Sequence, residues 1–352
     1  MLELYGWRSA LQQYANNIDH SPARVIARYR DLWRVVTEHG ERTARLSGRF
    51  AFEAAVGGYP VVGDWIAASE IGANEATIHS VLPRTGVFKR RAAGGEHAQI
   101  VAANIDVALI VAALNGDLNP RRIERYLVAA RDANAAPVVV LTKADLSLDP
   151  AADAARIAAV AAGAPVIALS ALEMSGVEQL DTWLTPGATA VLLGSSGAGK
   201  STLLNALAGA ERMPTGAIRA SDDRGRHTTT HRELFRIAGG ALIIDTPGMR
   251  ELGLLAEDGA LDASFADVAA LAARCGFHNC THESEPGCAV SDALASGALE
   301  PGRWRGYKKL QRELAYAARR EDPEAEAAER LKWKSIHKAQ RARYKARERG
   351  EE

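Results

Sequence analysis

The feature that most constrains this 352-residue chain is an eight-residue segment, GSSGAGKS, at positions 194 to 201. It fits the pattern GxxxxGK[ST], in which glycines let backbone N–H groups curl around phosphates. The apolar run AVLL precedes it and the helical stretch STLLNALAG overlaps its end, so the segment joins a buried strand to a helix. This context predicts a domain that binds a nucleoside triphosphate.

The roles within this loop follow from the chemistry of phosphates and magnesium. Lys200 can reach the β and γ phosphates, and the Ser201 hydroxyl is a ligand for Mg²⁺. Free N–H groups and the dipole at the start of the following helix add to the anion site. The predicted phosphate-binding residues are Gly194, Ser195, Ser196, Gly197, Ala198, Gly199, Lys200, Ser201 and Thr202.

Apolar runs alternate with helical stretches on both sides of this loop. Runs without polar alternation are typical of strands buried on both faces, and the interleaved helices supply crossovers between parallel strands. The predicted strands span residues 107–111, 137–142, 165–170, 189–193 and 242–245, and the predicted helices span 121–132, 151–162 and 200–208. We therefore expect an α/β P-loop domain with a mainly parallel sheet.

A different pattern precedes this domain. Five short segments alternate apolar and polar residues and are separated by Gly, Asp, Asn and Ser, as expected of strands. They read RVIARY, LWRVVTE, RFAFEA, VVGDWIAA and ATIHSVL. Five short strands with no long helix between them favour an all-β barrel of the OB type, with an SH3-like barrel as the alternative.

Two segments at strand ends indicate which base is bound. TKAD follows PVVVL and SAL follows PVIAL, and ligands bind at the carboxyl ends of strands in open α/β sheets. The Asp145 carboxylate can accept from N1 and the exocyclic amine of guanine together, a donor pair that adenine lacks. The Lys143 stem can lie along the base. The predicted base-binding residues are Thr142, Lys143, Ala144, Asp145, Ser170 and Ala171. An ATP-using P-loop enzyme such as a kinase is the alternative.

The later strand ALIIDTPG supplies further groups for the triphosphate. An Asp in this place binds Mg²⁺ through water and the Gly N–H contacts the γ-phosphate, while a Thr of the preceding HTTT segment can complete the magnesium shell. The predicted catalytic set is Lys200, Ser201, Thr229, Asp245 and Gly248. No Gln closely follows Gly248, so unaided hydrolysis should be slow, and His227, His231 or a partner's group are candidates to position the water.

All three cysteines lie within 14 residues, at Cys275, Cys280 and Cys288. Together with one imidazole they make a closed tetrahedral Cys₃His set, which is typical of structural zinc. Both His278 and His282 are close enough in sequence to be the fourth ligand. Because the segment is small and poor in apolar residues, it should lose its fold without the metal.

Hydropathy and charge limit where the protein can be located and what it can bind. The apolar runs are shorter than the roughly 18 to 20 residues of a membrane span. The first residues, MLELYGWRSALQQY, lack the features of a signal peptide. We therefore expect a cytoplasmic protein without a membrane partner, and nothing in the sequence demands more than a monomer. Formal net charge is zero, yet from Arg303 onward 16 Lys and Arg stand against 9 Asp and Glu.

This basic asymmetry indicates a polyanionic partner. Residues 331–349, LKWKSIHKAQRARYKARER, interleave basic and aromatic side chains, a pattern that suits RNA phosphates and exposed bases. Arginines near one end of the predicted barrel would add a second RNA surface. They are Arg24, Arg28, Arg30 and Arg34.

The order of the motifs is the reverse of that in ordinary GTPases, because the guanine-reading elements come first. TKAD, SAL, GSSGAGKS, HTTT and DTPG in this order, between a barrel and a Cys/His cluster, resemble the circularly permuted RsgA (YjeQ) GTPases of small ribosomal subunit biogenesis. The likeness covers roughly residues 22–310 and includes PVVGDW, VLPR and EPGCAV. It implies GTP, Mg²⁺ and one structural Zn²⁺ as cofactors, His282 as the fourth zinc ligand, and slow GTP hydrolysis that the 30S subunit stimulates during its late maturation. Some relatives carry a His where this chain has Ala256, so a catalytic His there is not implied.

The expected organisation has five parts. They are an N-terminal extension (1–21), an OB-like barrel (22–92), the circularly permuted GTPase domain (96–252), a helical zinc-binding module (253–310) and a basic helical tail (311–352). Permutation places the strand with Asp245 and Gly248 directly before the zinc module, so the nucleotide state can act on that module. The functional alternatives are another P-loop nucleotide-dependent RNA-binding assembly factor, and an RNA-binding scaffold with nucleotide as a structural filler.

Overall fold

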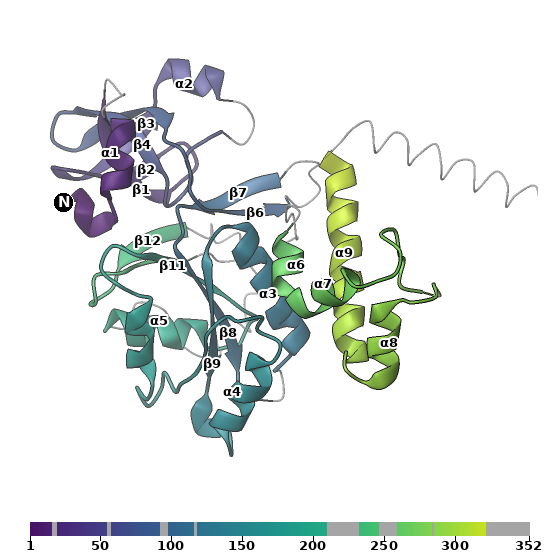
Figure 1. The fold of residues 1–352 in the computed structure, drawn as a ribbon. Helices are drawn as coiled ribbons and strands as arrows, with labels where there is room; N and C mark the ends of the chain where they lie inside the picture. Colours follow the sequence, from purple (N-terminus) through teal and green to yellow (C-terminus); the bar gives the residue numbers. More distant parts are fainter. Residues whose placement is uncertain are drawn as a thin grey trace, which may run out of the picture.

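The computed structural model describes residues 1–15, 20–54, 58–91, 98–115, 118–209, 232–245, 259–283 and 285–321. Across these ranges a sheet of 11 strands runs through a small barrel and an α/β domain, and a group of helices lies beside it (Figure 1). The predicted fold class, an OB-like barrel, a mainly parallel P-loop sheet and a helical Cys/His module, is confirmed. None of the helices described is long and apolar enough to cross a membrane.

The α/β domain contains five parallel strands and one antiparallel strand. In spatial order they are β10 (Val166–Ala168), β9 (Ala136–Thr142), β8 (Val107–Ala113), β11 (Thr189–Leu193), β13 (Leu242–Asp245) and β12 (Arg232–Arg236). Only the β12–β13 pair among these neighbours is antiparallel. The five predicted strands are all present. The sixth, β12, escapes prediction because Leu234 is its one fully buried residue.

Helices cover both faces of this sheet. They are α3 (Pro120–Asp132), α4 (Pro150–Ala158) and α5 (Lys200–Ala208), with the 3₁₀ turns η2 (Ala144–Leu146) and η3 (Val177–Thr182). Ile110 of β8 packs in the same core as Ile123 of α3, whereas its neighbour Leu109 packs in a second core with Leu203 of α5. Successive residues of one strand therefore serve opposite faces, which explains the unbroken apolar runs.

The barrel is closed by five strands. They are β1 (Ser21–Arg28), β2 (Trp33–Thr37), β3 (Gly40–Leu46), β4 (Trp65–Ile71) and β5 (Glu75–Val81). Their order is β1-β2-β3-β5-β4, and β4 pairs back with β1 to close the ring. Helix α2 (Gly48–Glu53) connects β3 to β4. This order and the helix at this connection are those of an OB fold, which decides against the SH3-like alternative.

One predicted barrel strand is wrong. The segment RFAFEA forms most of α2, and the third strand lies instead at residues 40–46. The Ser47 hydroxyl accepts from the Phe50 N–H and caps α2, a local signal that overrides the apolar alternation. Strand β3 is hidden in the sequence because Ala44 is its single fully buried residue.

Strand β12 joins the barrel to the α/β domain. It pairs antiparallel with β13 on one side and with β1 on the other, where Ala27 lies opposite Glu233. A separate hairpin, which was not predicted, pairs β6 (Val87–Arg91) with β7 (Ala98–Ala103). Residues 92–97 of that connection lie outside the described residues.

The N-terminal extension packs into the junction between barrel and α/β domain. It contains η1 (Leu2–Tyr5) and α1 (Ser9–Ala15). Gly6 has φ 85°, and a Cβ there would lie 2.5 Å from the Gly187 carbonyl oxygen, so only glycine fits. Arg8 forms an ion pair with Asp106 at 2.9 Å, just before β8. Residues from three parts of the chain therefore meet here.

Two of the family-like motifs, PVVGDW and VLPR, are joined by a buried ion pair. Asp64 has no exposed surface, and both of its carboxylate oxygens accept from Arg84, at 2.8 and 2.7 Å. Burial raises the pKa of Asp64, while the hydrogen bonds and charge of Arg84 oppose that rise. These motif residues therefore act in the structure of the barrel.

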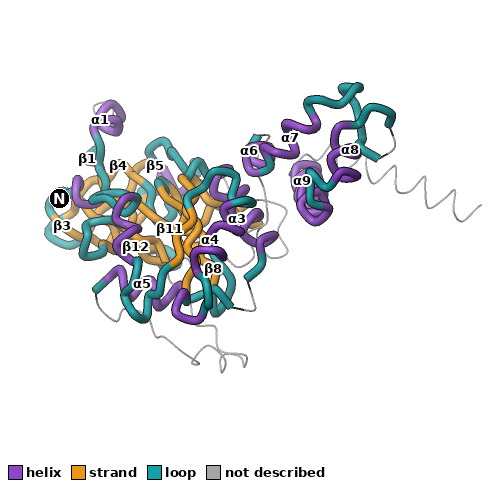
Figure 2. The backbone as a smooth tube through the Cα atoms, turned by 60° about the horizontal axis from the view of Figure 1, so that its bottom comes forward, coloured by secondary structure: helices purple, strands orange, loops and turns teal. Residues whose placement is uncertain are grey.

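The Cys/His module is built from short helices and one long one. They are α6 (Ala260–Ser264), α7 (Ala266–Ala272), α8 (Ala289–Ser296) and α9 (Pro301–Glu321). Figure 2 shows them grouped to one side of the strands. Helix α3 provides the contact surface for α6 and α9. Most of the predicted basic helical tail, residues 322–352, lies outside the described residues.

Candidate functional site

The P-loop turns sharply between β11 and α5 because of its glycines. A Cβ at Gly194 would lie 2.2 Å from the Val111 carbonyl oxygen, and Gly199 has φ 85° with Thr142 close to it. Within the described parts of the chain, no side chain caps the first turn of α5. The N–H groups of that turn therefore remain for an anion, as the sequence predicts.

Lys200 lies over the loop from the first turn of α5. Its ammonium donates to the carbonyl oxygens of Gly194 at 2.7 Å and Ser195 at 2.6 Å. This places a positive charge inside the ring of the loop, the position from which a P-loop lysine contacts phosphates.

The TKAD and SAL segments meet at the carboxyl ends of β9 and β10. The Ser170 hydroxyl donates to the Asp145 carboxylate at 2.6 Å, and the Ala144 N–H donates to the Leu169 carbonyl oxygen at 3.1 Å. Ser170 is buried, whereas Asp145 is exposed. The buried Ser170 hydroxyl thus orients the Asp145 carboxylate, which faces solvent and is accessible to a ligand.

Thr142 connects the TKAD loop to the P-loop. Its side chain is buried, and its hydroxyl donates to the Ala198 carbonyl oxygen of the P-loop at 2.7 Å. The sequence predicts Thr142 only as a member of the base-binding set. Its contact across 56 residues adds a structural role, because it links the two loops.

The remaining predicted catalytic residues come from the next strand and its flanking segments. Asp245 is the last residue of β13, which pairs with P-loop strand β11, so its backbone lies at the same edge of the sheet. The Asp245 side chain lies outside what the structure describes. So do four residues of the flanking segments, Thr229, Gly248, His227 and His231.

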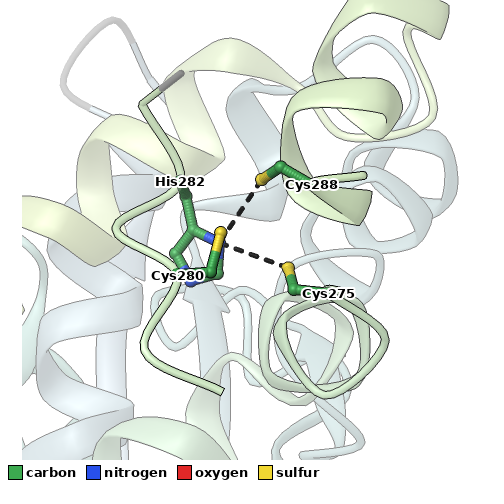
Figure 3. Close-up of side chains that lie close together, drawn as sticks. All are labelled: Cys275, Cys280, His282 and Cys288. Carbon is green, nitrogen blue, oxygen red and sulfur yellow. Dashed lines mark hydrogen bonds between the residues drawn. The ribbon is translucent and has the colours of Figure 1, made fainter. Parts of the chain in front are cut away.

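A metal-type cluster forms where the sequence predicts it. The ligand atoms of Cys275, Cys280, His282 and Cys288 all lie within 4.8 Å of one another (Figure 3). The His282 Nδ1 atom lies 3.4 Å from the Cys275 sulfur and 3.5 Å from the Cys288 sulfur. His278 is described but not part of the cluster, so the geometry selects His282.

These spacings fit zinc. Tetrahedral bonds of about 2.3 Å to sulfur and 2.0 to 2.1 Å to nitrogen place those two atoms about 3.5 Å apart. Three cysteines and one imidazole, with no carboxylate or open position, are the donors of a structural rather than a catalytic site. His282 has φ 61°, so a left-handed turn aims its ring at the sulfurs.

Comparison with known proteins places the whole chain in a family. A family model described as RsgA GTPase matches residues 81–255. The small ribosomal subunit biogenesis GTPase RsgA of Opitutus terrae is 49% identical, with 97% of each chain covered. A protein named small ribosomal subunit biogenesis GTPase RsgA 1, from Listeria innocua, is 45% identical over 99% of each chain. This chain belongs to the RsgA family of GTPases.

Solved structures show the same fold. YjeQ from Thermotoga maritima aligns with a TM-score of 0.64 and 25% identity, covering 84% of this chain and 98% of that one. YloQ, described as a circularly permuted GTPase, aligns with a TM-score of 0.61 and 22% identity, covering 84% of this chain and 95% of that one. The RsgA-family resemblance that the motif order indicates is thereby confirmed.

In this RsgA-family chain, one buried arginine ties the Cys/His module to the GTPase domain. Arg303, at the start of α9, donates to Glu124 of α3 at 2.7 Å. It also donates to both carboxylate oxygens of Asp267 of α7, at 3.0 and 2.7 Å. Burial raises the pKa of Asp267, but the hydrogen bonds and charge of Arg303 outweigh it and lower that pKa below its usual value.

The sequence does not identify the two partners of this link. Glu124 and Arg303 lie 179 residues apart, the first in a predicted helix and the second in the predicted zinc-binding module. A charged residue among the apolar positions of α3 was the one available signal, since Glu124 sits beside the buried Ile123. A buried carboxylate requires a partner, but not a particular one.

The predicted RNA surface on the barrel needs one correction. Arg24 is buried, and its guanidinium contacts the Tyr5 carbonyl oxygen, the Thr189 hydroxyl at 2.8 Å and the Trp65 ring. Burial lowers its pKa to about 10. Arg24 therefore holds the barrel against β11 and cannot contact RNA. The alternating pattern of β1 conceals this because arginine is seldom buried.

The other predicted RNA residues have mixed outcomes. Arg30 is exposed, whereas Arg34 pairs with Glu41 and with Glu233 of β12. Arg28 lies over the Trp33 ring, 5.6 Å from its centre. The basic and aromatic segment at residues 331–349 lies outside the described residues.

Proposed function

We propose that this RsgA-family GTPase binds the 30S ribosomal subunit through 16S rRNA and hydrolyses GTP to GDP and phosphate during late maturation of that subunit. The relatives that match nearly its full length are named for small ribosomal subunit biogenesis. The observation that carries the choice of GTP is the Ser170–Asp145 hydrogen bond, which orients a guanine-reading carboxylate at the edge of the sheet that holds the P-loop.

In this proposal the binding residues divide into three groups. Asp145, Lys143 and the backbone at Ala171 read and stack on guanine, while Ala144 and Ser170 hold Asp145 in place. Thr142 supports the site from behind. Phosphates lie in the loop formed by Gly194, Ser195, Ser196, Gly197, Ala198, Gly199, Lys200, Ser201 and Thr202.

The proposed magnesium ligands are the Ser201 hydroxyl, Asp245 through water, and Thr229. Mg²⁺ held by these residues would neutralise negative charge that develops during phosphoryl transfer. Lys200 would share that task, and the Gly248 N–H would contact the γ-phosphate. Since no Gln closely follows Gly248, a group that positions the water is absent from the usual place, and a partner is needed for fast turnover.

One Zn²⁺ held by Cys275, Cys280, His282 and Cys288 would be structural. We further propose that the protein acts as a monomer in the cytoplasm. The proposed units are residues 1–21, 22–92, 96–252, 253–310 and 311–352.

Turnover of GTP and ATP, measured side by side with and without purified 30S subunits, tests this function. We expect slow GTP hydrolysis, strong stimulation by 30S subunits and negligible ATP turnover. Equal use of ATP would favour a different P-loop enzyme. GTP binding without any stimulation by 30S subunits would favour an RNA-binding scaffold.

Replacement of Asp145 tests the guanine assignment. Asp145→Asn removes two charge-assisted hydrogen bonds of about 1.5 to 3 kcal/mol each, so GTP affinity should fall at least about 100-fold. An amide can instead donate to the second carbonyl of xanthine, so XTP binding should rise. Asp181→Asn, the same change at an exposed residue of η3, is the matched control and should leave both affinities unchanged.

A further inference from the structure

Helix α9 has two sides of opposite character. Arg303, Leu310 and Ala317 are buried at intervals of seven residues against the rest of the protein. The side turned away from them carries Arg305, Lys309, Arg312 and Tyr316, at helical intervals of four, three and four residues. All four are exposed, Tyr316 by 51%. We name these four residues the basic face.

Glu300, which directly precedes α9, and Glu313 within it do not neutralise this face. Glu300 pairs with Arg121 of α3, and Glu313 pairs with Arg125 of α3 at 2.7 Å, both on the side that contacts the GTPase domain. Among the described residues, the side chains of Arg305, Lys309 and Arg312 form no ion pair or hydrogen bond. Like charges three or four positions apart repel on a helix. Their clustering therefore opposes helix stability unless an outside anion is bound.

The position of this face is set by the Cys/His module. The ring of His282 packs edge-on against Trp304 with centres 5.6 Å apart, and Lys308 lies 5.6 Å over the same Trp304 ring. Arg303 fixes the start of the helix by its bonds to α3 and α7. The charges thus stand on a rigid element that is anchored at two points.

We propose that the basic face binds the phosphate backbone of RNA. The inference rests on the proposed function and names a surface for it, separate from the barrel and from residues 331–349. From Arg305 to Tyr316 the helix rises about 16 Å, enough to follow several phosphates of one strand. Two of its three cations are guanidiniums, whose planar fork matches phosphate oxygens. A half-exposed tyrosine at one end can stack on an unpaired base, which an acidic peptide would not use.

The test measures binding of the full chain to purified 16S rRNA at increasing KCl. Arg305→Gln/Arg312→Gln is compared with Arg156→Gln/Arg236→Gln, which removes the same charge from exposed residues of α4 and β12. Each lost phosphate contact flattens the log–log salt slope by about 0.7 to 0.9. The salt slope of Arg305→Gln/Arg312→Gln should therefore be flatter than that of the wild type by about 1.4 to 1.8. The salt slope of the control variant should equal that of the wild type. Both variants should keep the wild-type melting temperature and zinc content.

The outcomes separate this inference from the proposed function. If the wild type binds rRNA and responds to 30S subunits while both double variants keep its salt slope, the basic face is wrong and the function stands. If the wild type does not bind 16S rRNA, both fail. A parallel experiment measures the binding of the same proteins to heparin at increasing KCl. If Arg305→Gln/Arg312→Gln flattens the salt slope for heparin as much as for rRNA, the basic face is a general polyanion surface and the proposal is overturned.

Discussion

The nucleotide edge of the sheet and the Cys/His module both lie against α3, yet different interactions stabilise them. At the edge, strands buried on both faces support the loops, and the loops are joined by neutral or short polar contacts such as Thr142 to Ala198. In the module, α6 and α7 are only five and seven residues long. Besides apolar contacts with α3, their packing uses the four metal-type ligands and Arg303.

The difference teaches where single changes matter most. A site built on a buried sheet distributes its support over many apolar contacts, so losing one polar contact shifts affinity moderately. A small module concentrates its support in a few strong groups, so losing one of these removes its fold. The predictions below test this contrast, beginning with the largest effect.

Loss of the metal should have the largest effect, and it should be confined to the module. Structural zinc contributes about 10 to 16 kcal/mol in zinc-finger peptides. His282→Ala should therefore abolish zinc binding and hydrogen-exchange protection at residues 259–299, while GTP affinity changes little. Zinc content and exchange are measured together. His278→Ala is the matched control, because this nearby histidine lies outside the cluster. Zinc loss in the control alone would reverse the assignment of the ligand.

Removal of Arg303 should come next. Arg303→Met breaks the buried pair with Glu124 and the half-exposed pair with Asp267, and breaking a buried pair costs about 3 to 5 kcal/mol. Arg121 still pairs with Glu124 at 2.7 Å, so we expect a loss near the lower end of that range. Chemical denaturation should show that loss in the transition that includes the module. Arg305→Met, two positions along on the exposed side of α9, should change stability by less than about 0.5 kcal/mol. Similar stabilities for the two variants would show that the module does not depend on this link.

The sequence predicts the nucleotide edge well because its chemistry is local. GSSGAGKS, TKAD and SAL each follow a strand directly, so the parallel order of the strands brings them together. The Cys/His cluster is equally predictable, since all three cysteines lie in one short segment of the sequence. Thr142 and Arg24 show the limit. Each has a type and spacing that suit a ligand contact, but each is buried and bonds to a distant segment of the chain.

The misread parts of the fold have the same physical origin. Strands β3 and β12 each bury only one residue fully. Their existence depends on pairing partners rather than on their own apolar pattern. The segment RFAFEA became helical through the Ser47 cap, and the Glu124–Arg303 pair depends on how α9 packs on α3. Strand pairing and helix packing between distant segments determine these features, and the local sequence pattern does not predict such contacts.

The smallest predicted effect belongs to Thr142, at the nucleotide edge. Thr142→Val keeps the shape of the side chain but leaves the buried Ala198 carbonyl oxygen without this donor, which costs about 1 to 3 kcal/mol. Because the lost bond joins the base-reading and phosphate-reading loops, GTP and GDP affinities should fall together by about tenfold. Thr142→Ser keeps the hydroxyl and should restore most of the affinity, whereas general damage to packing would not be rescued. Zinc content should stay constant throughout, since the module draws no support from this bond. A loss of zinc in Thr142→Val would show that the two regions are not independently stabilised, and the contrast between them would fail.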